Sequence, residues 1–245
     1  MSTQLTTKSL FAKQSVQDRF EKLLGNKAQG FISSVLQIVN GNTLLQNASP
    51  ETVLNAAATA AVLNLEINPN LGLAWIVPYK GRAQFQMGWK GFVQLALRTS
   101  QYKNINVIEI YENQFKSFNA LTECLDADFS VEGSGKVVGV ASYLKLVSGF
   151  EKTVYWSMEK VKAHATKYSK TYGKVNKSGQ LIHSPWNDED QFISMCLKTV
   201  LKSTISKWGI MSIEMQTAQL ADQSVQAEQG KYDYIDNNQT IDVDQ

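Results

Sequence analysis

The sequence predicts an α+β fold. We expect a helical N-terminal region, then central β-hairpins that form an antiparallel sheet packed with helices, including a long C-terminal helix, and finally a disordered acidic tail. Apolar residues recur every three or four positions near both ends, but alternate with polar residues in the middle. A hydrophobic fraction of 43% is typical of a globular chain. We expect one domain at 16–220, between a flexible N-terminus at 1–15 and the tail at 221–245.

The N-terminal region has the spacing of short amphipathic helices. Apolar residues repeat with a helical period at 16–24 and again at 31–39. A clearer helix begins after Ser49, whose residue type suits an N-cap, with Pro50 in the first turn. The Asn-Pro-Asn sequence at 68–70 is expected to end this helical region.

A β-hairpin is predicted next. Residues 73–79 are rich in Trp, Ile and Val, and residues 82–87 alternate strictly between polar and apolar types, with Lys80 and Gly81 in the turn. The alternation predicts one buried face and one polar face. The polar face would carry Arg82, Gln84 and Gln86.

The remaining elements alternate between helix and sheet. We expect helices at 89–99, 158–168 and 188–208, and strands at 105–111, 137–147 and 150–156. Residues 169–184 are rich in Gly, Ser and Lys and are predicted to form a mobile loop. Three tryptophans on apolar faces are assigned to the core: Trp75, Trp156 and Trp208.

The formal net charge of +2 hides a strong segregation of charge. Residues 80–103 contain five cations and no acid, and residues 152–207 contain ten lysines against four acids. Residues 208–245 contain one lysine against seven acids. A basic body with an acidic tail indicates a polyanionic partner.

Motifs for nucleotide or metal chemistry are incomplete. The Gly-Ser-Gly-Lys sequence at 133–136 lacks the first glycine and the hydroxyl residue of a phosphate-binding loop, so an ATP-driven motor is not expected. Two pairs of acids could hold Mg²⁺ in a nuclease, but we assign them to a turn (Asp126, Asp128) and a helix start (Asp188, Asp190). We expect no cofactor, no metal site and no catalytic residue.

Three basic segments carry interleaved aromatic residues. The first is Tyr-Lys-Gly-Arg at 79–82 followed by Trp89 and Lys90, the second spans 167–177, and the third is the lysine series of the long helix. Single-stranded nucleic acids require this mixture, because cations meet a phosphate at every nucleotide and rings stack on bases.

Like charges also recur along single helix faces. Lys198 and Lys202 lie four residues apart, where they repel each other unless an anion neutralises them. Lys160, His164 and Lys167 repeat this spacing on the preceding helix, and the loop at 167–184 contains no acid that could organise it. We interpret these features as a nucleic-acid-binding surface rather than as ordinary solvated lysines.

Two separated motifs carry a family resemblance. The first consists of WIVPYK at 75–80, FQMGWKG at 85–91 and LALRT at 95–99; the second consists of SPW at 184–186, Met195, KTVLK at 198–202 and SIE at 212–214. Together they resemble the RecT family of phage and prophage single-strand DNA annealing proteins, or recombinases. The likeness spans roughly 20–215, and Trp89 stands where the family more often has Tyr.

The resemblance implies a protein that coats single-stranded DNA and anneals complementary strands in phage-type homologous recombination without ATP. It also implies assembly into rings or helical filaments, a partner exonuclease, and binding of the annealed duplex as well as the single strand. Phosphate contacts or base stacking are expected from fifteen residues. They are Tyr79, Lys80, Arg82, Trp89, Lys90, Arg98, Lys160, Lys167, Tyr168, Lys170, Tyr172, Lys174, Lys198, Lys202 and Lys207.

Three alternatives share parts of this evidence. A passive strand-coating protein would have the same cations and rings but would oppose pairing. A Mg²⁺-dependent nuclease would use the scattered acids, and an RNA chaperone would differ only in the sugar that it reads. The acidic tail could solubilise the protein, compete for the basic surface, or bind the host single-strand-binding protein.

The location of the protein is predicted from what the sequence lacks. The N-terminus has no apolar core of a signal peptide, and no window reaches the ~18 apolar residues of a membrane span. Cys124 and Cys196 are expected to be inert thiols. We expect a cytoplasmic protein without a membrane partner.

Overall fold

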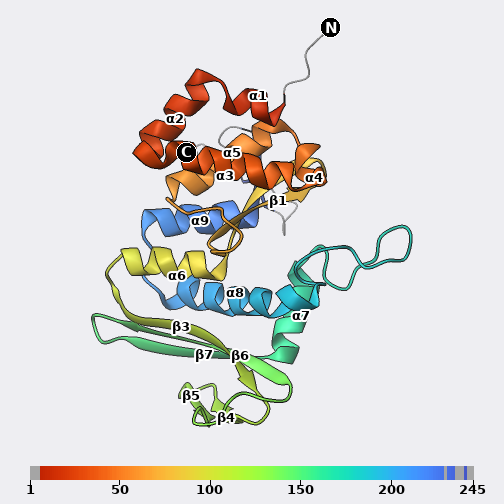
Figure 1. The fold of residues 1–245 in the computed structure, drawn as a ribbon. Coiled ribbons are helices and arrows are strands. Elements are labelled where there is room, and N and C mark those ends of the chain that lie inside the picture. Colours follow the sequence, from red (N-terminus) through yellow and green to blue (C-terminus); the bar gives the residue numbers. More distant parts are fainter. Residues whose placement is uncertain (1–5, 229–230, 235–239, 242–245) are drawn as a thin grey trace. The chain divides into compact units, whose positions relative to one another are not determined.

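Short helices form the first part of the chain, as the periodicity predicts. The computed structural model (Figure 1) describes residues 6–228, 231–234 and 240–241. It divides into a helical unit, Met1–Gly91 with Ile213–Gln245, and a sheet unit, Phe92–Ser212. The predicted domain at 16–220 therefore contains parts of both units. The α+β class is confirmed.

The helices of the helical unit bury a cluster of phenylalanines. Phe20 stacks on Phe11 with ring centroids 5.8 Å apart, and Phe31 lies 5.7 Å from Phe20. A helix with Phe11 buried thus occupies part of the segment that we expected to be flexible. The elements are α1 (Thr7–Phe11), α2 (Gln14–Leu24), the 3₁₀ turn η1 (Gly25–Lys27), α3 (Ala28–Asn40), α4 (Thr43–Gln46) and α5 (Pro50–Val62).

Helix α5 begins at the predicted residue but is not capped as predicted. Ser49 is the N-cap residue and Pro50 follows it, yet the Ser49 hydroxyl donates a hydrogen bond to Glu51 Oε2 at 2.7 Å instead of accepting one from the helix. This hydrogen bond is the main reason that the pKa of Glu51 is lowered. The helix ends at Val62, before the Asn-Pro-Asn sequence.

The predicted hairpin consists of β1 (Ala74–Tyr79) and β2 (Arg82–Met87). Helices α5 and α9 (Ile213–Gln223) both pack against β2. The Met87 amide donates to Asp222 Oδ1 at 2.9 Å, which fastens α9 to the end of the hairpin. Gln84 is only 8% exposed, so the prediction that it belongs to an open polar face is wrong.

The acidic tail contains short strands where we predict disorder. Strands β8 (Ser224–Glu228), β9 (Lys231–Tyr234) and β10 (Thr240–Ile241) pair antiparallel in the order β10–β9–β8. The prediction of disorder at 221–245 includes residues 229–230, 235–239 and 242–245, which lie outside the described residues. The prediction of a flexible N-terminus likewise includes residues 1–5, which are not described.

The sheet unit is built on an antiparallel sheet in the order β3–β6–β7 (Figure 1). The strands are β3 (Tyr102–Tyr111), β6 (Val137–Leu146) and β7 (Glu151–Ser157). Helices α7 (Met158–Tyr168) and α8 (Glu189–Trp208) pack against this sheet, and α6 (Trp89–Arg98) contributes residues to both units.

A second hairpin, β4 (Phe115–Asn119) with β5 (Cys124–Ala127), was not predicted. A register shift between Phe115 and Ser117 breaks the period of two that a strand search relies on. The shift lets Phe115 and Phe118 both contact the ring of Tyr155, with ring centroids 5.0 and 5.4 Å apart, respectively.

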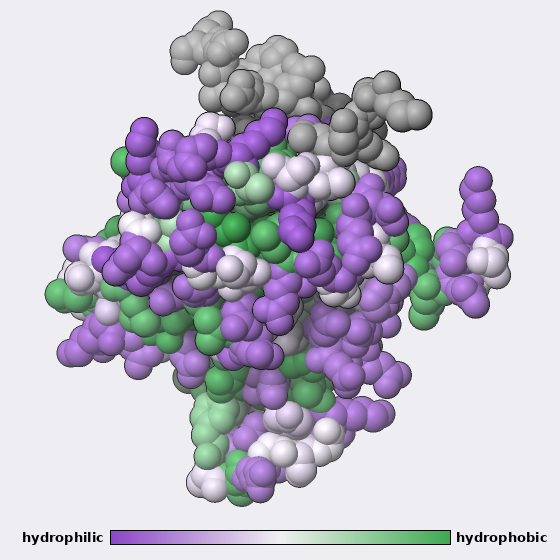
Figure 2. Space-filling model, turned by 45° about the horizontal axis from the view of Figure 1, so that its top comes forward, coloured by the Kyte–Doolittle hydropathy of each residue, from purple (hydrophilic) through white to green (hydrophobic). Residues whose placement is uncertain are grey.

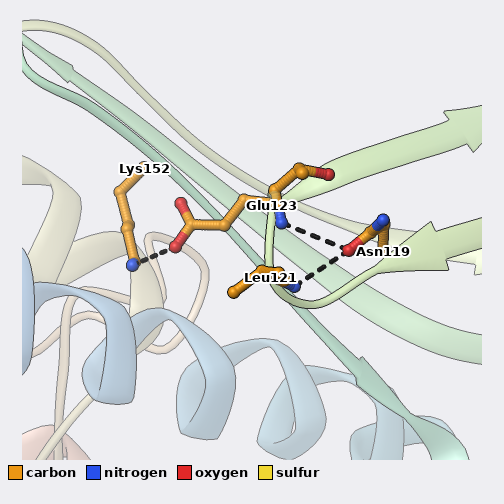
Figure 3. A network of polar contacts seen from close by, with 5 residues as sticks. Asn119, Leu121, Glu123 and Lys152 are labelled. Carbon is orange, nitrogen blue, oxygen red and sulfur yellow. Dashed lines mark hydrogen bonds and ion pairs between the residues drawn. The ribbon is translucent and has the colours of Figure 1, made fainter.

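The tip of this second hairpin is held by a polar network (Figure 3). Asn119 Oδ1 accepts a hydrogen bond from the Leu121 amide at 3.0 Å, and Glu123 forms an ion pair with Lys152 of β7. Lys152 Nζ also lies 3.6 Å from the ring centroid of Trp208. Trp208 is 44% exposed under this ammonium group, so its assignment to the core is wrong.

Candidate nucleic-acid interface

The turn of the β1–β2 hairpin presents Lys80 to solvent. Lys80 and Gly81 have φ values of +48° and +74°, the pair of positive values that a two-residue type I′ turn requires. The Ser49 amide donates to Gly81 O at 3.0 Å, and the Ala83 amide donates to Thr52 Oγ1 at 2.8 Å. Both bonds tie the turn to the start of α5. The predicted turn is therefore confirmed.

One face of this hairpin combines rings with a cation. Tyr79 is paired with Arg82 and Trp75 with Gln86, so these side chains share one face. Lys80 Nζ lies 5.5 Å from the centroid of the Tyr79 ring. Trp75 is 36% exposed, which overturns its assignment to the core and adds a ring to this face.

Two glycines position Trp89 and Lys90 at the start of α6. A Cβ atom would lie 2.0 Å from the carbonyl oxygen of Gly72 if placed on Gly88, and 2.2 Å from that of Leu73 if placed on Gly91. Only glycine permits this close backbone approach. Trp89 is partly exposed and Lys90 is exposed, with its Nζ 5.8 Å from the Trp89 ring centroid.

The sheet unit carries a series of three rings, which we call the ring ladder: Trp156, His164 and Tyr168. The His164 ring lies 5.3 Å from that of Trp156 and 4.5 Å from that of Tyr168. Lys160 Nζ is 4.7 Å from the Trp156 centroid, and Lys167 Nζ is 5.1 Å from the Tyr168 centroid. Each outer ring of the ladder therefore has an ammonium group beside it.

The ring ladder is accessible to solvent. Tyr168 is 44% exposed, whereas Trp156 and His164 are partly exposed, so Trp156 is not the core residue that we predicted. Burial lowers the pKa of His164, and the positive charges of Lys167 and Lys160 lower it further. A neutral imidazole between two ammonium groups is expected at neutral pH.

Three other rings form what we call the anchor cluster: Tyr172, Trp186 and Phe192. The Tyr172 ring lies 5.9 Å from that of Trp186 and 6.1 Å from that of Phe192, and Trp186 and Phe192 are 6.0 Å apart. These contacts join both ends of the segment between α7 and α8. Tyr172, predicted to contact DNA, is therefore placed against other rings of the protein.

The segment that we predicted as a mobile loop has internal structure. Residues 169–187, here called the finger, are closed at the base by Asn187, which accepts from the Gly173 amide at 2.9 Å and donates to Thr171 O at 2.7 Å and Ile182 O at 2.8 Å. Further out, Val175 and Leu181 form an antiparallel bridge. The finger projects from its unit (Figure 1), and Figure 2 shows hydrophilic and hydrophobic side chains interleaved along it.

The cations of the finger and of the helices next to it differ in exposure. Lys170 and Lys174 on the finger are exposed, as are Lys207 and Arg98. Lys198 is only 8% exposed. Lys202 is partly exposed, and its Nζ lies 6.0 Å from the centroid of Phe92. The three α8 lysines therefore do not form one continuous exposed row. Helix geometry also separates them, because at about 3.6 residues per turn Lys207 points about half a turn away from Lys198.

The paired acids have structural partners. Asp128 accepts hydrogen bonds from the Ser130 amide and hydroxyl, and Asp188 caps α8 by accepting from the Asp190 amide at 3.0 Å. No group of three or more potential metal-binding side chains is found within the described part of the chain. Burial raises the pKa of the Cys196 thiol to about 12, which keeps it protonated.

Trp75 and Trp156 were missed as site residues because a tryptophan on an apolar strand face usually belongs to the core. A spacing signal existed for Trp156. It stands four residues before Lys160, which is followed at steps of four by His164 and Tyr168. A step of four keeps residues on one side of a helix, and Trp156 lies just before α7 begins.

Exposed and partly exposed rings beside ammonium groups are typical of proteins that bind single-stranded nucleic acids. A sequence model of the RecT family matches residues 29–237, so the chain belongs to the RecT family. This is a family of DNA annealing proteins that bind single strands in recombination.

A relative in Bacillus subtilis (strain 168) supports this assignment. The chain is 46% identical to the uncharacterized protein YqaK over 213 residues, which cover 87% of this chain and 70% of YqaK. No helix within the described ranges is long and apolar enough to cross a membrane.

Proposed function

We propose that this protein binds single-stranded DNA and anneals complementary strands without ATP, as an assembly of several copies. The observation that carries the proposal is the pairing of rings with ammonium groups in both units, at Tyr79 with Lys80 and along the ring ladder. Such pairs offer a stacking surface for bases beside a charge for phosphates.

The energy for annealing can come from the DNA. Each stacked base-pair step contributes roughly 1.4 kcal/mol, so a long complementary pair needs no nucleotide fuel. The protein has to reduce the repulsion between two phosphate chains and keep bases unstacked from one another. A surface that combines rings with lysines suits that task.

We assign phosphate contacts to the exposed and partly exposed cations. Lys198 is so little exposed that a phosphate contact would require its neighbours to move. Base contacts are assigned to Tyr79, Trp89 and Tyr168, and closure over the strand to the finger. The proposed phosphate contacts are Lys80, Arg82, Lys90, Arg98, Lys160, Lys167, Lys170, Lys174, Lys202 and Lys207.

The cellular setting is part of the proposal. A phage-type exonuclease would supply the single strand, and the acidic tail would tune access to the cations or bind the host single-strand-binding protein. We place the protein in the cytoplasm and assign self-association into rings or filaments to the helical unit.

The test is annealing of two complementary oligonucleotides of mixed sequence without ATP, with the protein removed before the duplex is scored. We expect faster duplex formation for the complementary pair and none for a non-complementary control. Binding with slowed pairing would make the protein a passive strand coat. A Mg²⁺-dependent loss of labelled DNA would make it a nuclease.

A further inference from the structure

The buried residues of α7 do not belong to the ring ladder. Val161 and Ala165 supply the buried face of that helix, at 0% and 1% exposure. Tyr168 lies near the end of the helix with almost half of its surface open. A ring that is 44% exposed and is held 4.5 Å from a second ring can offer its open surface to a ligand.

The charges around the ladder favour an anion. Within the described ranges, neither Lys160 nor Lys167 has a carboxylate at ion-pair distance, although Lys116, Lys145 and Lys152 of the same unit each have one. Both free ammonium groups lie over rings, and such exposed cation–π contacts are weak. A phosphate can therefore draw each ammonium group aside and uncover the ring beneath it.

We propose that the ring ladder is a binding site for unpaired nucleobases: Tyr168 and Trp156 stack on neighbouring bases of one strand, while Lys160 and Lys167 contact the phosphates on either side. This inference rests on the proposed function, because it names the part of the sheet unit that holds bases during annealing. His164 sets the separation of the two outer rings, with its own ring between them.

Stacking and phosphate contact can be separated with two probes on the same backbone. One is a dT oligonucleotide, and the other is an equally long strand of abasic sites. We expect Tyr168→Leu to weaken binding of the dT strand by roughly 5- to 150-fold, which is the range for the loss of one base–ring stack. The same variant should weaken binding of the abasic strand by less than about 2-fold, because that strand has no base to stack. Titrations followed by fluorescence anisotropy measure both.

Three further variants control the result. Tyr168→Phe keeps the ring and is expected to bind both strands as the wild type does. The double variant Lys160→Gln with Lys167→Gln is expected to weaken both strands. Tyr143→Leu removes a tyrosine of the same unit whose hydroxyl bonds to Glu151, and it is expected to change neither.

The outcomes distinguish the ladder from the proposed function. If the wild type binds the dT strand tightly and Tyr168→Leu binds it equally well, the ladder is not a base site, although the protein still binds DNA. Equal losses on both strands would also overturn the inference, since they would show a structural role. If the wild type binds neither strand, the proposed function fails as well.

Discussion

The ring ladder and the anchor cluster are neighbours in sequence but differ in what their rings contact. In the ladder, the outer rings carry ammonium groups and Tyr168 is 44% exposed. In the anchor cluster, Tyr172, Trp186 and Phe192 contact one another and join the two ends of the finger. Both contain a tyrosine from the same Lys- and Tyr-rich segment.

The difference shows that composition alone does not separate a binding ring from a structural one. Tyr168 is the last residue of α7, whereas Tyr172 follows the turn in which Ser169 Oγ accepts from the Thr171 and Tyr172 amides. That turn directs Tyr172 toward Trp186. Although Tyr168 and Tyr172 are only four residues apart, we therefore expect a mutation of Tyr168 to lower the affinity for DNA and a mutation of Tyr172 to lower the stability of the fold.

The largest expected effect comes from removing an anchor ring. Trp186→Ala should lower the free energy of unfolding by about 2–4 kcal/mol, because a large, partly buried aromatic side chain is lost. Tyr168→Ala should lower it by less than about 1 kcal/mol, as expected for an exposed site. Urea denaturation measures both, and equal losses would remove the distinction between the two clusters.

A second change tests how the finger is closed. Asn187→Ala removes two donated hydrogen bonds and one accepted one, each worth about 1 kcal/mol. We expect trypsin to cleave faster at Lys170, Lys174 and Lys177. Asn113→Ala is the matched control, since Asn113 likewise bridges a loop through Glu132 O and the Ser134 amide, far along the chain from the finger. Unchanged cleavage in Asn187→Ala would show that Asn187 does not close the finger.

The lysines of the ladder should govern the salt dependence of DNA binding. Each phosphate contact on a single strand contributes about 0.7 to the slope of log affinity against log salt concentration, so Lys160→Gln with Lys167→Gln should flatten it by about 1.4. Lys145→Gln, which removes a lysine already paired with Glu151, should leave the slope unchanged. An unaltered slope in the double variant would exclude phosphate contacts by these two lysines.

The smallest expected effect is a pH dependence from His164. Its folded pKa lies below the unfolded value of about 6.5, mainly through burial, so the unfolded chain takes up its proton first as the pH falls. The unfolding free energy of the wild type should therefore decline relative to His164→Gln below pH ~6.5. His183→Gln, at an exposed histidine of the finger, is the comparison. If the difference in unfolding free energy between the wild type and His164→Gln stayed constant from pH 8 to 5, the prediction would be contradicted.

Most of the elements could be predicted from the sequence, because their apolar spacing is regular. Strand β2 and helix α7 begin and end at the predicted residues. The β4–β5 hairpin could not be predicted, since its register shift hides the alternation. The anchor cluster could not be predicted either, since Tyr172 and Phe192 meet only through the path of the finger.

The candidate site was predicted less completely than the fold. Cations at a turn or a helix end, such as Lys80 and Arg98, are exposed as expected. Lys198 is not exposed, because the face of α8 that carries Lys198 and Lys202 also packs inside the sheet unit. Trp75 and Trp156 look like core residues in sequence, and only the tertiary structure shows how much of each ring stays open.

The most direct test of the central claim, that the ring ladder holds unpaired bases, is photo-crosslinking to a single strand containing 5-iododeoxyuridine, with the linked peptides identified by mass spectrometry. We predict crosslinks at Trp156 or Tyr168, and their loss at position 168 in Tyr168→Leu. Efficient crosslinking confined to the β1–β2 hairpin or to the anchor cluster, with none on the ladder, would contradict the account.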